Sequence, residues 1–208
     1  MSLFKKDLEQ EEILGRFLSE HYQKIKLKFQ RIHQMDLQLL GVDLLLEGKN
    51  NLTYKVDEKA QLHYLNKDLP TFALEMSYLK AGEMKQGWLF DTNKVTEIYF
   101  FIFSIHLFNP LETMNHENDI QSCEVVLVNR IRLLNELSKK GLDFQECTRI
   151  NDLLRAEKVK TRIVFAEGFN FQISNQIEEK PVNLIVRKKF LESIGKKYVF
   201  KRINLQLV

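Results

Sequence analysis

The chain has 208 residues, enough for one domain with its own core, and its 44% hydrophobic residues with 15 Phe exclude a disordered protein. The formal net charge is only +3, which permits a nucleic-acid partner without requiring one. The two cysteines, Cys123 and Cys147, form neither a Cys-x-x-Cys pair nor a Cys/His cluster, which fits a reducing compartment.

The N-terminal segment predicts an amphipathic helix over about residues 8–28. Its apolar side chains recur every three to four residues, from Leu8 to Ile25. We expect most glutamates beside this stripe to be solvated and one at its edge to reach a site on the sheet; we assign this role to Glu12, with Glu20 as the second choice. The first residues lack the apolar run of a signal peptide, so we expect a cytoplasmic protein.

Residues 41–60 predict two antiparallel strands, Val42–Glu47 and Leu52–Ala60, joined by the turn-forming run Gly-Lys-Asn-Asn. If the turn is centred near Asn50, the pairing places the aspartate of the first strand opposite the aspartate of the second, within one residue. Gly41, just before the first strand, would let substrate or a neighbouring strand approach closely.

The two facing aspartates are Asp43 and Asp57, and Lys59 lies on the same face as Asp57 because side chains alternate along a strand. Like charges placed opposite each other destabilise a sheet unless a positive group lies between them. Two acids and a lysine at one point suit a divalent metal ion and an activated water. The alternative is a structural Asp57–Lys59 ion pair with Asp43 merely exposed.

The segment after the hairpin predicts three more strands, which we expect to join it in one mixed sheet of about five strands: Thr71–Tyr78, Gly87–Phe90 and Thr96–Ile105. Residues 80–86 read as a polar turn between the first two. The most apolar stretch, residues 98–108, is too short to span a bilayer, so we expect no membrane partner.

The second half predicts helices and short strands of lesser definition. The expected helices are 129–140, 143–157 and 188–194, and the expected strands are 124–128, 162–165, 169–173 and 198–207. Because no repeat and no linker rich in Pro, Gly or Ser interrupts the chain, we predict a single domain over residues 1–208.

Basic residues are concentrated near the C-terminus, where residues 180–202 contain eight Lys or Arg against the single acid Glu192. A second basic cluster leads into the first strand. Such clusters can contact phosphates, although a solvated surface explains them equally well. The predicted nucleic-acid contacts are Arg31, Lys188, Lys189, Lys196 and Lys197.

The order of a helix, then Gly-Val-Asp on one strand, then Val-Asp-Glu-Lys-Ala on the next resembles the core of the PD-(D/E)XK nuclease superfamily, the restriction-endonuclease-like fold. Asp43 matches the first acid of the motif and the Asp-Glu-Lys run matches its (D/E)xK element, while Val42 stands where Pro is usual. The resemblance covers about residues 8–105, and the C-terminal half would elaborate the same domain. It implies an α/β (α+β) fold with a central mixed sheet flanked by helices.

The resemblance also implies a reaction. Asp43 and Asp57, with the backbone carbonyl of Glu58, would bind Mg²⁺ or Mn²⁺, and Lys59 would position the attacking water and compensate the anionic transition state. The expected function is therefore a metal-dependent endonuclease that hydrolyses DNA phosphodiester bonds, of restriction, repair or mobile-element type. The alternative is a catalytically silent nucleic-acid-binding or assembly subunit with a nuclease-like fold.

Three further residues are candidates for supporting roles. Glu75 would hold a metal-bound water, or else is a solvent-facing strand residue; Gln61 would orient water or phosphate, or else is a loop amide. Trp88 is expected to be core rather than a base-stacking platform. No phosphate-binding loop, His-Glu-x-x-His or Gly-x-Ser-x-Gly motif is present, so we expect no nucleotide cofactor. Whether two copies pair to cut both strands stays open.

Overall fold

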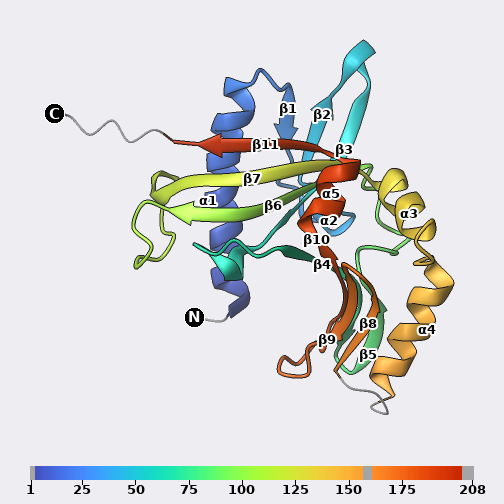
Figure 1. Cartoon of the computed structure of the whole chain (residues 1–208). Helices are drawn as coiled ribbons and strands as arrows, with labels where there is room; N and C mark the ends of the chain where they lie inside the picture. The colour runs from blue at the N-terminus through green and yellow to red at the C-terminus, as the bar shows by residue number, and fades with distance from the viewer. Residues whose placement is uncertain (1–2, 157–160, 203–208) are drawn as a thin grey trace.

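The computed structural model describes residues 3–156 and 161–202, and these form an α/β structure with two β-sheets (Figure 1). Their α-helices are α1 (Leu3–Lys24), α2 (Met35–Leu39), α3 (Arg130–Ser138), α4 (Phe144–Arg155) and α5 (Lys188–Ile194). Their strands are β1 (Phe29–Arg31), β2 (Leu44–Glu47), β3 (Thr53–Ala60), β4 (Thr71–Lys80), β5 (Glu83–Gln86), β6 (Ile98–Leu107), β7 (Ile120–Asn129), β8 (Arg162–Ala166), β9 (Phe169–Ile173), β10 (Val182–Arg187) and β11 (Lys196–Lys201).

The first sheet is mixed and has six strands in the order β1-β2-β3-β6-β7-β11. Only β3 and β6 pair in parallel; the other neighbours are antiparallel. Helix α1 crosses one face of this sheet (Figure 1), where Phe17, Leu18 and Tyr22 pack against Phe100 and Phe200. The apolar stripe of the helix therefore covers this face, as its periodicity predicted.

The second sheet is antiparallel and has five strands in the order β5-β4-β10-β9-β8. Its apolar side chains, such as Leu74 and Phe171, share one core with Tyr99 and Phe101 on the other face of the first sheet. Helices α3, α4 and α5 add side chains to the same core, among them Leu133. The α/β class is thus confirmed, but the single sheet of about five strands is wrong.

The error in the sheet begins at β4, which pairs with β10 and β5 rather than with the β2–β3 hairpin. Between β4 and β5 the chain turns at Ala81 and Gly82, which have φ of +52° and +79°. Strand β5 is exposed along its whole length and therefore lacks the alternation of apolar and polar residues that marks a half-buried strand. Its polar residues were for this reason predicted to form a turn. The expected strand at residues 87–90 is instead a turn.

Other boundaries differ for local reasons. Helix α1 ends at Lys24, not Lys28, and Lys26 has a φ of +57° that a helix does not accommodate. Strands β1 and β10 and helix α2 were not predicted. Strand β1 and helix α2 have only three and five residues, whereas the six-residue β10 was overlooked although its burial alternates along the strand. The helices and short strands expected in the second half are present, and residues 203–207 of the last expected strand lie outside the described residues.

Candidate active site

Strands β2 and β3 separate where the two predicted acids lie. Their ladder runs from Glu47↔Thr53 to Leu44↔Val56 and ends there, since Asp43 precedes β2 and its N–H donates to the Val56 carbonyl at 2.8 Å. The two aspartates lie just beyond the last ladder pair, so the hairpin brings them near each other, but the ladder contains no Asp43–Asp57 pair. Beyond the last ladder pair, the backbone N–H of Glu58 donates to Asp43 Oδ2 at 2.7 Å, so a side chain replaces the neighbouring strand as acceptor.

Asp57 lies on β3 where the two strands separate, and its side chain is only 2% exposed. Its Oδ1 lies 2.7 Å from the Lys59 Nζ. Its Oδ2 is buried and has no hydrogen-bond partner among the described residues, which is costly for a carboxylate oxygen. The carboxylate is therefore held through one oxygen by Lys59, while the other oxygen is buried beside Gly41 without a hydrogen-bond partner among the described residues.

The electrostatics of the site follow from this crowding. Burial, and then the charge of Asp57, raise the pKa of Asp43 from 3.8 to about 7. Burial lowers the pKa of Lys59, but Asp57 and Asp43 outweigh it, and the pKa lies above the ordinary 10.5. Lys59 is therefore an ammonium ion at neutral pH, and its positive charge attracts both aspartates.

Gly41 fixes the backbone that leads to Asp43. Its φ is +78°, and a Cβ at this position would lie 2.5 Å from Thr96 Oγ1 and 3.2 Å from Asp57 Oδ2. Three successive carbonyls, at residues 39–41, accept hydrogen bonds from Lys94 Nζ, the Val95 N–H and Thr96 Oγ1 at 2.7, 3.0 and 2.7 Å. The close approach expected at this glycine is thus made by the segment that leads into β6.

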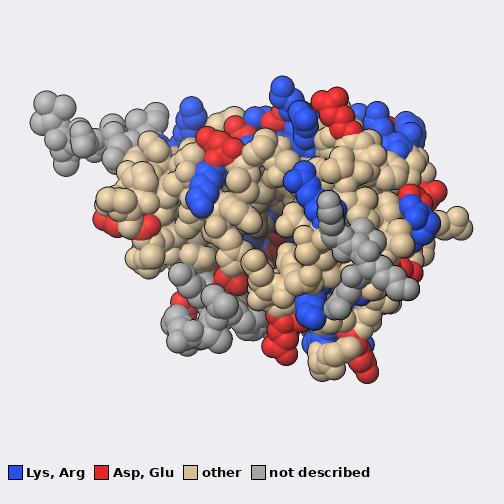
Figure 2. Space-filling model, turned by 60° about the horizontal axis from the view of Figure 1, so that its bottom comes forward, with Lys and Arg blue, Asp and Glu red and all other residues tan. Residues whose placement is uncertain are grey.

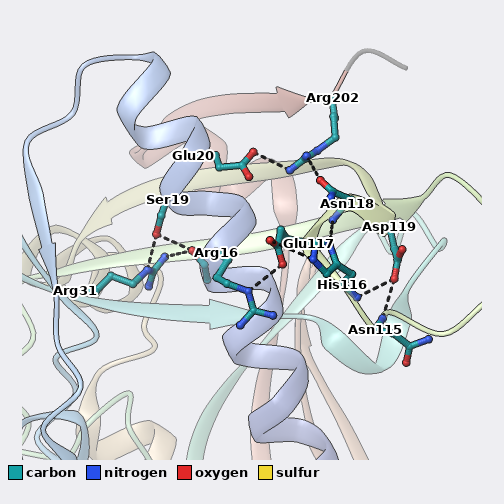
Figure 3. Close-up of polar contacts among 11 residues, drawn as sticks. Arg16, Ser19, Glu20, Arg31, Asn115, His116, Glu117, Asn118, Asp119 and Arg202 are labelled. Carbon is teal, nitrogen blue, oxygen red and sulfur yellow. Dashed lines mark hydrogen bonds and ion pairs between the residues drawn. The ribbon is translucent and has the colours of Figure 1, made fainter. Parts of the chain in front are cut away.

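On the opposite face of β3, the Glu58 side chain is held by an arginine and a tyrosine. Arg31 Nη1 donates to Glu58 Oε2 at 2.6 Å, and the Tyr22 hydroxyl donates to Oε1 at 2.7 Å. The Arg31 guanidinium also donates to Ser19 Oγ and to the Gly15 carbonyl on α1 (Figure 3). Arg31, a predicted phosphate contact, is thus used in fastening β1 and β3 to α1.

A cavity of about 840 Å³ lies between α1 and the edge of the first sheet, and Asp43 and Glu58 line it. Both Glu11 and Glu12 of α1 also line it. Desolvation raises the pKa of Glu11, with Lys59 opposing the rise and Asp57 contributing to it. Although exposed, Glu11 is thus close enough to respond to the charges of Lys59 and Asp57, and the sequence analysis missed it.

The helical periodicity could have identified Glu11, because it lies three residues before Leu14 and seven before Leu18 and is therefore on the same side of the helix as these buried residues. The second choice, Glu20, instead accepts a hydrogen bond from Arg202 Nη2 at 2.7 Å, and Arg16 pairs with Glu117 at 2.9 Å farther along the same helix (Figure 3).

The two remaining predicted residues lie toward the second sheet. Gln61 Nε2 donates to the Thr71 carbonyl at 2.8 Å and so ties the end of β3 to the start of β4. Glu75 is half-buried and, together with Lys59, lines a second cavity of about 340 Å³. Burial raises the pKa of Glu75, with Lys59 acting against it. Glu75 therefore belongs to the surroundings of Lys59.

Of the lysines near the C-terminus that were predicted to contact nucleic acid, two are bonded to other side chains of the protein and two are exposed. Lys188 is 14% exposed and donates to Ser104 Oγ at 2.7 Å, and Lys197 lies 2.8 Å from Glu192 and 3.0 Å from Glu124. Lys189 and Lys196 are exposed. Neighbouring strands lie ~4.8 Å apart, so β11, three strands from β3 in the sheet, lies roughly 14 Å from the aspartates. One face of the molecule shows acidic and basic residues interspersed, with both visible inside a hollow (Figure 2).

A divalent cation was predicted from these acids. Within residues 3–156 and 161–202, no group of three or more His, Cys, Asp and Glu side chains could hold a metal ion. The donors that remain are Asp43, Asp57 and backbone carbonyls. They fit Mg²⁺, which binds through one or two carboxylates and keeps several waters, and the partnerless Asp57 Oδ2 is the oxygen it would take.

Comparison with family models, curated proteins and solved structures finds no match for this chain. The likeness to PD-(D/E)XK nucleases therefore stays a prediction, as does the restriction-endonuclease-like core. Of the helices in the described part of the chain, none is long and apolar enough to cross a membrane.

Proposed function

We propose that the protein is a divalent-metal-dependent nuclease that hydrolyses DNA phosphodiester bonds, with Asp43, Asp57 and Lys59 as its reaction centre. The observation that carries the proposal is the buried Asp57, which binds Lys59 through one oxygen and leaves the other without a partner among the described residues. A structural ion pair alone explains neither the partnerless oxygen nor the second carboxylate opposite it. Such unfavourable charge placement is typical of functional sites.

Each residue has a role that follows from its surroundings. Asp43 and Asp57, with the Glu58 carbonyl, would hold the cation, which when bound supplies a Lewis acid for the phosphate. Lys59 is protonated, so it acts as a hydrogen-bond donor that orients water and offsets the charge of the transition state, not as a base. Arg31 and Tyr22 fix Glu58, and thereby the backbone between Asp57 and Lys59.

The test is cleavage of supercoiled plasmid by the full chain with Mg²⁺ or Mn²⁺. Asp57→Ala and Lys59→Ala should each abolish nicking while circular dichroism shows a folded protein. Glu83 and Lys85 form a matched control, because this acid and lysine are also two residues apart and 2.7 Å from each other, but on the exposed strand β5. Glu83→Ala and Lys85→Ala should leave nicking intact, and cleavage that survives both site changes refutes the proposal.

The second candidate is a catalytically silent nucleic-acid-binding subunit. It is favoured by the lack of a three-acid group among the described residues and by the exposed Lys189 and Lys196. It predicts salt-sensitive DNA binding without cleavage under any divalent metal. The same plasmid assay, repeated with a binding measurement at two salt concentrations, separates the two candidates.

A further inference from the structure

The second cavity begins at Lys59 and extends away from the aspartates. Its volume of about 340 Å³ is within the usual range of small-ligand pockets. Glu75 and Tyr78 of β4, Gln86 of β5 and the half-buried Trp88 line it together with Lys59. Since Lys59 also binds Asp57, a group in this cavity lies directly beside the proposed reaction centre.

Trp88 gives the cavity a fixed aromatic wall. Its ring packs on Tyr99 and Phe101, with centroid distances of 5.0 and 6.2 Å, and its carbonyl accepts a hydrogen bond from the Tyr99 hydroxyl at 3.2 Å. The Lys59 Nζ lies 5.5 Å from the ring centroid. Trp88 is thus partly core, as the sequence suggested, but it also faces a space next to the reaction centre.

The polar groups of the cavity indicate what it accepts. Glu75 brings a half-buried carboxylate and Gln86 an amide, and Asp91 and Glu179 add further acids. The lining also contains Lys59 and Lys94, but their ammonium groups already bind Asp57 and the Leu39 carbonyl, so the acids disfavour a phosphate. An ionised carboxylate only accepts hydrogen bonds, and on nucleobases it pairs with exocyclic amino groups such as cytosine N4. An aromatic wall with such acceptors suits a flat ring that carries an amino group.

We propose that this cavity receives an unpaired nucleobase adjacent to the scissile phosphate and prefers a base with an exocyclic amino group. The base lies against Trp88, and its amino group donates to Glu75. This inference rests on the proposed nuclease function and narrows its substrate. In a duplex the amino groups are paired, so the substrate is single-stranded DNA, a frayed or branched end, or a flipped base.

Trp88 is the sole tryptophan of the chain, so in the folded protein the tryptophan fluorescence, excited selectively over tyrosine, comes from the wall of this cavity. The full chain is titrated in EDTA with the single-stranded hexanucleotides dC6 and dT6, whose bases differ at the edge that Glu75 would read. We expect saturable quenching, with dC6 effective at about tenfold lower concentration than dT6. Absence of quenching, or equal quenching by both, overturns the proposal.

Two variants test the assigned contacts. Glu75→Gln should bring the dC6 to dT6 ratio close to one, because an amide both donates and accepts, while Glu83→Gln on β5 should leave the ratio unchanged. Anisotropy of labelled dC6 should show binding about tenfold weaker in Trp88→Leu, and largely kept in Trp88→Phe. An unchanged ratio in folded Glu75→Gln, or unchanged binding in Trp88→Leu, also overturns the proposal.

The cavity and the reaction centre can fail separately. Plasmid cleavage without quenching by either hexanucleotide would keep the nuclease and remove the base pocket. Quenching with a preference for dC6, but without cleavage under any divalent metal, would keep the pocket and remove the nuclease. If Glu75→Gln does not fold, the comparison of dC6 with dT6 on the unaltered protein still decides.

Discussion

Replacing Asp43 by asparagine should stabilise the metal-free protein, whereas the same change at Asp57 should destabilise it. The charge of Asp57 disfavours the ionised form of Asp43, but only Asp57 has an ion-pair distance of 2.7 Å to Lys59. The asparagine of Asp43→Asn would keep an oxygen for the Glu58 N–H and would remove the repulsion between the aspartates. The asparagine of Asp57→Asn would leave the Lys59 ammonium without its charged partner in a crowded site.

The magnitude follows from the pKa of Asp43. Its rise from 3.8 to about 7 means that the folded state disfavours the ionised form by about 4 kcal/mol at alkaline pH, at about 1.36 kcal/mol for each pKa unit. This figure already includes the opposing attraction of Lys59, and the burial of the polar asparagine amide reduces the expected gain for Asp43→Asn to about 2–4 kcal/mol. Asp57→Asn should cost about 2–4 kcal/mol, less than for a fully buried pair because water reaches Lys59 in part.

The sign of the pH dependence is fixed by the same shift. Because the pKa of Asp43 is higher in the folded than in the unfolded state, this carboxyl lowers the stability of the folded state as pH rises from about 4 to about 7. The difference in unfolding free energy between Asp43→Asn and the unaltered protein should therefore be near zero at pH 4 and reach its maximum above pH 7.

The assay is urea unfolding in EDTA at pH 4, 5.5 and 8, followed by the fluorescence of Trp88. Destabilisation by Asp43→Asn at pH 8, or a difference that does not change with pH, would refute the reasoning. Mg²⁺ should shift the difference in favour of the unaltered protein by about 2.7 kcal/mol at a hundred times its Kd, because it adds this much to the unaltered protein and little to a variant without Asp43.

Three other changes test separate parts of the structure. Arg31→Met should lower the unfolding free energy by about 2–3 kcal/mol because it leaves Glu58 charged and without its cation; adding Glu58→Gln should recover most of the loss, and additive effects in denaturant unfolding would contradict this. Gly41→Ala should cost about 1–3 kcal/mol and abolish plasmid nicking, since it combines strained backbone with a steric clash; retained nicking would show that this backbone position is not required. Lys189→Gln and Lys196→Gln should each reduce the slope of log affinity for DNA against log salt by about 1, and an unchanged slope would remove them from the interface.

The sequence predicted the parts of the site that depend on local pairing. Asp43 and Asp57 belong to one hairpin, so the turn and the strand pairing were sufficient to bring them near each other at the end of the ladder. The position of Lys59 beside Asp57 was predicted from the alternation of side chains along β3. The helix stripe was also local, and its periodicity places Glu11 nearer to the sheet than Glu12, although this was overlooked.

The parts that sequence reasoning missed depend on distant partners. Strand β4 pairs with β10, more than a hundred residues away, and nothing in its alternation distinguishes the first sheet from the second. Arg31 reads as a basic surface residue until Glu58 is found beside it. Lys188 similarly reads as a phosphate contact until it is seen against Ser104. The sequence shows where the charged side chains are, but only the fold shows which groups of the protein they bind.

The hydrogen bonds from residues 94–96 to the carbonyls of residues 39–41 have a consequence for how the site forms during folding. The hairpin that carries Asp43 and Asp57 can close early, because its contacts are local. Closing it alone brings two carboxylates together with no fixed backbone around them. The segment that locks Gly41 comes from the approach to β6, 55 residues farther along, so the repulsive pair is fixed only after the parallel strand has docked. The two aspartates are thus fixed late, by contacts that span more than fifty residues.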